Sequence, residues 1–297
     1  MTSGFTLGRH INTSKGFTTA PSYASSIGCG IFQIFLGVPM RVLSKARTKK
    51  ELVTFSNELE KYNIHMVVHA SYTINLCHPP SNPKYDASVK ALKQDLAASK
   101  IIGDRCLGVI IHMGKNVAEN GITNQEAINN YINSLNAVLE TTDEETTIIL
   151  ETGASQGTEV GSCIDELGEI YWGVNENKRH RIKFCIDTCH IWATGYDISS
   201  EAKVKAFFKE FDDKIGIYNI ACIHFNDSKT DIGSKVDRHA DLSYGKIGAK
   251  GLKYFAIYSR KYDIPLITET PLNSVNPKTN KDVTFKEELV KIKYWLK

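Results

Sequence analysis

Short apolar runs alternate with longer amphipathic segments along the chain, a pattern typical of alternating strands and helices around a parallel sheet. Six of the apolar runs end in a histidine, an aspartate or a glutamate. These ends are His69 in MVVHA, His112 in LGVIIHM, Glu151 in TIILE, Asp187 in KFCID, His224 in ACIHF and Glu269 in LITE. Such runs predict strands that are buried on both faces.

Two further apolar runs, residues 5–8 and 31–36, raise the predicted strand count to eight. Segments with apolar residues at helical spacing lie between the strands, at residues 48–62, 87–102, 124–139, 203–211, 250–262 and 285–296. This order predicts a (β/α)8 TIM barrel that forms one domain over residues 1–297. The alternative, an open doubly wound sheet, lacks its usual early G-x-G-x-x-G turn here.

In a TIM barrel, polar residues at the C-terminal ends of the strands form the active site. Three polar loops follow strands on that same face, at residues 71–86, 188–200 and 227–248. Long loops in this position usually serve binding. We therefore expect the functional site at this end of the barrel.

Composition limits the binding partners and the cellular compartment that we expect. A net charge of +3 over 297 residues is too small for a global field that attracts polyanions, so any such binding must depend on local charge. The seven cysteines have scattered spacings and predict reduced thiols. The N-terminal residues show no secretion signal and no run is long enough to span a membrane, which together predict an intracellular, reducing compartment, cytoplasm or nucleus. The basic run 45–50 is either a nuclear localisation signal or, more simply, a solvated helix start.

Nine residues form the candidate metal-ligand set. Asp187 and His190 are three residues apart in IDTCH, and Asp237 and His239 are two apart in VDRH, so each pair can face one cavity. The set is His69, His112, Glu151, Asp187, His190, His224, Asp237, His239 and Glu269. Mixed His/Asp/Glu ligation without cysteine is typical of catalytic zinc, manganese or iron, and nine ligands suffice for two or three ions.

Each candidate also has an ordinary structural explanation. Asp187 alone would cap the following helix, and Glu269 alone would pair with a lysine. These explanations fail collectively, because they must account for six strands that end in the same chemical class. The remaining histidines, His10, His65, His78 and His180, are not expected to be ligands, although His10 is placed to support one.

The motifs HASYTINLCHP, ILETGASQG, CIDTCHIWATGYD, IHFNDSK, GSKVDRH and IPLITETP, in this order between about residues 8 and 271, resemble those of the endonuclease IV family of apurinic/apyrimidinic (AP) endonucleases. The resemblance implies a TIM barrel with three zinc ions, with manganese as an alternative. It implies that His69 and His112 bind one metal and that Glu151 bridges to a second. Asp187, His224 and Glu269 would complete the second site, and His190, Asp237 and His239 would form the third.

The resemblance also implies an activity and a partner. Family members hydrolyse the phosphodiester 5′ to an abasic site, leaving a 3′-hydroxyl and a 5′-deoxyribose phosphate, and they trim blocked 3′ ends. The expected partner is double-stranded DNA, bound by a monomer away from any membrane, and Glu151 and Glu269 are the expected catalytic residues. The resemblance places Tyr72 in the minor groove and either Met40 or Arg41 within the DNA. Basic residues also crowd the loop 227–248, and of these Arg238 is expected to contact phosphate.

The sequence departs from the family pattern at Ser243 (usually Gly), Thr268 (usually Leu) and Met113 (usually Pro). Two other classes of protein compete with the nuclease. A metal-dependent sugar isomerase or epimerase also carries His, Asp and Glu at the strand ends of a barrel, but Asp237, His239 and the long loop 227–248 favour the nuclease. A DNA-lesion binder without catalytic activity is the other, and the intact ligand set argues against it.

Overall fold

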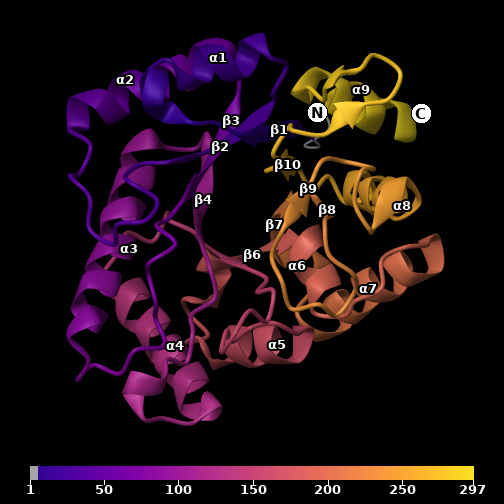
Figure 1. Cartoon of the computed structure of the whole chain (residues 1–297). Helices are drawn as coiled ribbons and strands as arrows, with labels where there is room; N and C mark the ends of the chain where they lie inside the picture. The colour runs from indigo at the N-terminus through magenta and orange to yellow at the C-terminus, as the bar shows by residue number, and fades with distance from the viewer. Residues whose placement is uncertain (1–5) are drawn as a thin grey trace.

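The computed structural model describes residues 6–297, and eight parallel strands in it form a closed barrel, which confirms the predicted fold class. The strands are β1 (Leu7–His10), β2 (Ile31–Phe35), β3 (His65–His69), β4 (Cys106–Ile111), β5 (Ile148–Glu151), β6 (Ile182–Asp187), β7 (Ile220–His224) and β10 (Leu266–Thr268). Neighbours pair in the order β1-β10-β7-β6-β5-β4-β3-β2, so β1 and β2 close the ring (Figure 1). Of the first predicted strand, residue 5 lies outside the described residues.

Helices surround the barrel on its outside (Figure 1). They are α1 (Ala20–Ser26), α2 (Lys49–Tyr62), α3 (Pro83–Ile102), α4 (Asn124–Leu139), α5 (Ile164–Gly173), α6 (Thr188–Ala193), α7 (Glu201–Lys214), α8 (Gly248–Lys261) and α9 (Phe285–Trp295). Thr48, Thr123 and Thr284 begin α2, α4 and α9 with reciprocal capping boxes, which satisfy amides at the helix start. Four of the six residues in the basic run 45–50 precede α2, and only Lys49 and Lys50 are helical.

Three helices differ from the sequence prediction. The short α1 and the ten-residue α5 were not predicted, and α6 occupies residues that were predicted as loop. α6 has only six residues, all of them buried, so it shows no alternation between an apolar and a polar face. The loop predicted to end at residue 86 ends earlier, because α3 begins at Pro83 after the N-cap Asn82.

The register of the strands brings their C-terminal ends level with one another. Asp187 lies opposite His224 in the pairing of β6 with β7, and Glu151 lies opposite Cys185 in the pairing of β5 with β6. His112 and Glu269 lie one residue beyond β4 and β10. The parallel ladder therefore places the predicted strand-end residues around one rim.

Apolar side chains fill the barrel beneath this rim. One buried cluster inside the ring comprises Ile31, Val67, Ile110, Ile149, Cys185, Cys222 and Ile267, and a larger one lies between the barrel and its helices. All seven cysteines are unpaired, in agreement with the prediction of reduced thiols. Between residues 6 and 297, every helix is too short or too polar to cross a membrane.

Two small antiparallel sheets stand outside the barrel. β8 (Asp227–Ser228) pairs with β9 (His239–Ala240), and β11 (Val275–Asn276) pairs with β12 (Lys281–Asp282). The first sheet matters for the site, because β8 closely follows β7 in the chain and its Ser228 pairs with His239. This pairing places His239, from the middle of the loop 227–248, next to the barrel rim.

Candidate metal centre

The structure brings all nine predicted ligand residues together at the C-terminal rim of the barrel, in overlapping groups. In each group the candidate ligand atoms lie within 4.8 Å of one another. The groups are His69, His112 and Glu151; Glu151, Asp187, His224 and Glu269; Asp187, His190 and His239; and Cys189, Asp237 and His239. The shared members Glu151, Asp187 and His239 join the groups into one centre.

Glu151, at the end of β5, lies between two groups and turns one carboxylate oxygen toward each. Its Oε2 atom is 3.3 Å from Nε2 of His69 and 3.3 Å from Nε2 of His112. Its Oε1 atom is 2.8 Å from Nδ1 of His224. The side chain is 1% exposed, so both oxygens depend on these partners for compensation of burial.

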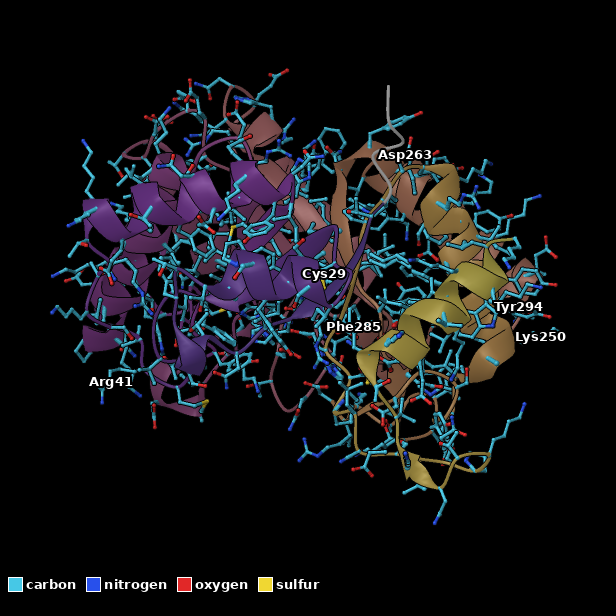
Figure 2. The ribbon with its side chains drawn as sticks, turned by 90° about the horizontal axis from the view of Figure 1, so that it is seen from above. Cys29, Arg41, Lys250, Asp263, Phe285 and Tyr294 are labelled. Carbon is cyan, nitrogen blue, oxygen red and sulfur yellow. The ribbon has the colours of Figure 1, made fainter. Side chains whose placement is uncertain are left out.

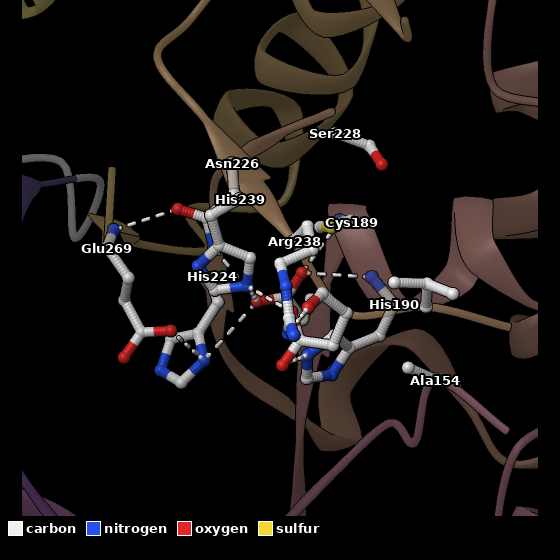
Figure 3. A network of polar contacts seen from close by, with 12 residues as sticks. Ala154, Cys189, His190, His224, Asn226, Ser228, Arg238, His239 and Glu269 are labelled. Carbon is white, nitrogen blue, oxygen red and sulfur yellow. Dashed lines mark hydrogen bonds and ion pairs between the residues drawn. The ribbon is translucent and has the colours of Figure 1, made fainter. Parts of the chain in front are cut away.

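Asp187 also divides its two oxygens between two roles. Oδ1 accepts hydrogen bonds from the amides of Cys189 (2.7 Å) and His190 (3.1 Å), so Asp187 does cap α6. Oδ2 lies 3.5 Å from Nε2 of His239 and accepts from Asn226 Nδ2 at 2.8 Å. Helix capping and ligand presentation are therefore compatible in this residue, and Figure 3 labels its partners Cys189, His190, Asn226 and His239.

The predicted third site, His190, Asp237 and His239, spans two of these groups and is supplied by α6 and the loop after β7. Nε2 of His190 lies 3.3 Å from Oδ2 of Asp237, and Nε2 of His239 lies 3.1 Å from its Oδ1. Both nitrogens are buried and, among the described residues, neither makes a hydrogen bond of acceptable geometry. Buried polar atoms without a partner need an explanation, and a cation between two imidazoles and a carboxylate supplies one. This donor set fits a divalent metal ion.

The charges in the centre favour bound cations. Burial opposes protonation of His224, but the carboxylates of Glu269 and Glu151 outweigh it and raise its pKa to about 10. For His239, burial is likewise outweighed by Asp187 and Asp237, and its pKa rises to about 9. Burial would raise the pKa of Glu269, yet the neighbouring His224 lowers it to about 2. The carboxylates thus stabilise positive charge at these positions, whether as protons or as metal ions.

Backbone carbonyls orient two of the imidazoles. Nδ1 of His69 donates to the carbonyl of Ala70, and Nδ1 of His190 donates to the carbonyl of Thr152, both at 2.7 Å. These bonds place the proton on Nδ1 and leave the lone pair of Nε2 directed into the centre. They follow from the local backbone, which the sequence pattern does not reveal.

Sequence reasoning missed three side chains of the centre. Gln33 and Asn226 are fully buried and contact candidate ligands, and Cys189 belongs to one of the groups. A signal existed for Gln33, since it is the single polar residue within the apolar run IFQIF. Burial raises the pKa of the Cys189 thiol to about 12, so it is a poorer ligand than the neighbouring carboxylate and imidazole.

The other four histidines occupy different positions. His10 contacts Gln33 through its Nδ1 atom at 3.0 Å, so it supports the centre from outside the ligand groups. Burial lowers its pKa to about 4. His65 begins β3 and His180 shortly precedes β6, at the opposite end of the barrel. His78 is buried in the segment between β3 and α3.

The residues predicted to contact DNA surround the centre and are exposed. The Tyr72 ring is 45% exposed and packs edge-on against His112, with ring centroids 5.1 Å apart. It also contacts Phe35, at 5.1 Å, rather than standing apart from the centre on its own loop. Met40 is 71% exposed, and Arg41 projects from the edge of the molecule (Figure 2). Arg238 is exposed between Asp237 and His239 and donates to the Asp237 carbonyl.

The three departures from the family pattern lie near the rim but outside the ligand groups. Ser243 has a φ of +73°, the left-handed region that glycine adopts most easily. Thr268 is buried at the end of β10, and its hydroxyl has no hydrogen-bond partner within residues 6–297. Met113 is buried directly after His112. All three are compatible with the observed fold.

Comparison with known proteins agrees with the geometry. Residues 21–289 match the family described as xylose isomerase-like TIM barrel. A protein of Acanthamoeba polyphaga mimivirus that carries the name endonuclease 4 is 60% identical over 98% of this chain and 93% of its own length. An endonuclease 4 relative in Staphylococcus aureus strain Newman is 33% identical over 97% of this chain and 94% of its own.

Among solved structures, endonuclease IV from Thermus thermophilus aligns with a TM-score of 0.78 at 27% identity, over 98% of both chains. A D-tagatose 3-epimerase-like protein aligns with a TM-score of 0.70 at 13% identity, over 98% of this chain and 97% of the other, which indicates a shared fold alone. The barrel by itself therefore does not separate nuclease from epimerase, whereas sequence identity along the whole chain does. The chain belongs to the endonuclease IV family.

Proposed function

We propose that this protein is a zinc-dependent DNA-repair hydrolase that cleaves the phosphodiester 5′ to abasic sites in double-stranded DNA and trims blocked 3′ ends. The observation that carries the proposal is Glu151, which directs one oxygen to the His69–His112 pair and the other to His224. A carboxylate with its oxygens directed in this way would serve as a ligand to two metal ions. Paired metals are typical of phosphodiester hydrolysis, because they neutralise charge on both sides of the phosphorus.

The donor groups support three zinc sites, with manganese as an alternative. In this proposal His69 and His112 would hold one ion, and Glu151 would be shared with a second ion whose other ligands would be Asp187, His224 and Glu269. His190, Asp237 and His239 would hold the third. When bound, such ions supply a nucleophilic water near neutral pH and stabilise the departing oxygen.

The chain's own contribution is to orient ligands and keep them ionised. Burial opposes ionisation of Glu151, but His224 and His112 lower its pKa well below the usual value. Glu151 and Glu269 therefore remain carboxylates at neutral pH, and their catalytic role is to hold metal charge next to the scissile phosphate.

An incision assay tests the proposal. Metal-loaded protein is incubated with a duplex that carries one abasic site, with the undamaged duplex as control, and metal content is measured on the same preparation. Cleavage 5′ to the site with about three zinc equivalents is expected. Isomerisation or epimerisation of a free sugar without incision would favour the rival enzyme class, and tight binding of abasic DNA without cutting would favour a lesion binder.

DNA contact is tested separately by Tyr72→Ala, with Met40→Ala and Arg41→Ala as companions. An aromatic ring at the rim can wedge against bent DNA, so Tyr72→Ala is expected to raise KM for the abasic duplex about tenfold and to leave metal content unchanged. Of the companions, the larger rise in KM identifies which residue enters the DNA. An unchanged KM in all three variants would contradict the proposed binding face.

A further inference from the structure

Gln33 is a fully buried amide in the middle of β2 that contacts two candidate ligands and one further histidine. Its Nε2 atom donates to Oε1 of Glu269 at 2.7 Å and to Nδ1 of His10 at 3.0 Å. Its Oε1 atom lies 2.7 Å from Nε2 of His224. The neighbouring inward residue of the same strand, Ile31, belongs to the apolar interior, so a polar side chain at Gln33 needs a specific reason.

These three contacts fix where the protons lie. A carboxylate only accepts hydrogen bonds, so the amide nitrogen must face Glu269 and the amide oxygen must face His224. His224 consequently carries a proton on Nε2. Its Nδ1 atom is then directed at the carboxylates, 3.3 Å from Oε2 of Glu269 and 3.8 Å from Oδ2 of Asp187.

The same amide gives the two oxygens of the Glu269 carboxylate different partners. Oε1 is held by Gln33, so Oε2 is the oxygen presented to the centre. The backbone of Glu269 is fixed independently, because its amide donates to Oδ1 of Asn226 at 2.8 Å (Figure 3). Gln33 therefore acts on the side-chain rotation of Glu269 and not on the position of its backbone.

We propose that Gln33 is a positioning residue that orients His224 and Glu269 together as ligands of the metal that they share with Asp187 and Glu151. The inference rests on the metal centre of the proposed function. One amide sets the ring orientation of the first ligand and the rotation of the second, so it couples two residues from different parts of the barrel, one at the end of β7 and one directly after β10. Groups that orient metal ligands in this way typically contribute 10–100-fold in metal affinity.

The test compares Gln33→Met and Gln33→Glu with the wild-type chain and with Ile31→Val. Gln33→Met keeps the length of the side chain but removes both polar atoms. Gln33→Glu keeps an acceptor for His224 but removes the donor to Glu269. Ile31→Val perturbs the same strand one layer deeper without touching a ligand, and it serves as the control for loss of stability alone.

Zinc is the probe, and transfer of zinc to a chromogenic chelator is followed together with Tm. Both Gln33 variants are expected to release one zinc equivalent about 10–100-fold more readily than the wild type. Cobalt-substituted protein should show an altered visible absorption in the same variants. Ile31→Val should lower Tm and retain its metal.

Wild-type zinc retention and cobalt spectra in a folded Gln33→Met or Gln33→Glu variant would overturn the inference, whatever their Tm. Should one variant fail to fold, the other decides. The two proposals fail separately: a wild-type chain that binds zinc but leaves abasic DNA intact contradicts the function alone. Normal incision by the wild type, with unaltered zinc retention in the Gln33 variants, contradicts the role of Gln33 alone.

Discussion

The candidate ligands fall into two regions that are built differently. His69, Glu151, Asp187 and His224 end barrel strands and are at most 1% exposed. The ligands on the loop 227–248 are more open than these four: the Asp237 side chain is 35% exposed and that of His239 is 18% exposed. Strand pairing fixes the first region, whereas the second must be held by contacts of its own.

Those contacts come largely from one carboxylate, Asp227, at the start of the loop 227–248. Asp227 is fully buried, and its two oxygens accept from five backbone amides, those of Ser228, Ser243, Gly245, Ile247 and Gly248. Asp241 similarly accepts from three amides after β10, those of Leu272, Asn273 and Ser274. The comparison teaches that buried acids can substitute for a sheet in fixing a ligand-bearing loop.

Glu151→Gln is the largest change, because it removes the charge shared by the group of His69 and His112 and the group of Asp187, His224 and Glu269. Incision is expected to fall by at least about 10³-fold, since a neutral amide neither bridges two metals nor balances their charge. Single-turnover cleavage of an abasic duplex measures this directly. Near-normal turnover of the variant would contradict the bridging role.

Asp227→Asn should weaken the loop region selectively. An amide NH2 would face backbone N–H donors, so the loop loses part of its anchor. One metal equivalent should bind about 10–100-fold more weakly, and incision should recover with excess zinc. Metal content against free zinc gives the answer, with Asp231→Asn, exposed on the same loop, as the matched control. Equal loss of all metals would show that the two regions are not separable.

Asp95 offers a pH test on the strand side. It lines a small cavity together with His69 and Arg41, and burial raises its pKa to about 7. When the pKa of a carboxyl is higher in the folded state, the free energy of unfolding of the protein falls as pH rises from about 4 to about 7. Asp95→Asn should therefore raise Tm at pH 8 by a few degrees, which corresponds to about 1–2 kcal/mol in the free energy of unfolding. At pH 4 the gain should be small. A change in metal content would show that the strand ligands depend on this cavity.

Ser243→Gly should have the smallest effect. Glycine adopts the observed φ of +73° without steric strain, so the variant should be more stable by at most about 1 kcal/mol, partly offset by backbone entropy. Denaturant unfolding measures this, and incision should not change. A loss of stability would mean that the serine side chain contributes to the loop.

The barrel and the strand-end residues were predictable because both depend on local pattern: apolar runs make strands, and parallel pairing brings their ends together. The grouping of His190, Asp237 and His239 rested on short spacings and on family resemblance, since a loop path has no periodicity to read. Gln33 and Asn226 act through side-chain geometry that appears only after folding. The helix α6 was missed for a similar reason, because burial on all sides leaves it without an amphipathic pattern.

The divided carboxylate of Asp187 has a consequence for assembly. One oxygen starts the helix that carries His190, and the other faces His239 and Asn226. A cation bound to Asp187 would therefore affect both the start of α6 and the loop that carries His239. We expect binding at the two groups that share Asp187 to be coupled, so that a cation in the group of Asp187, His190 and His239 raises the affinity of the group of Glu151, Asp187, His224 and Glu269.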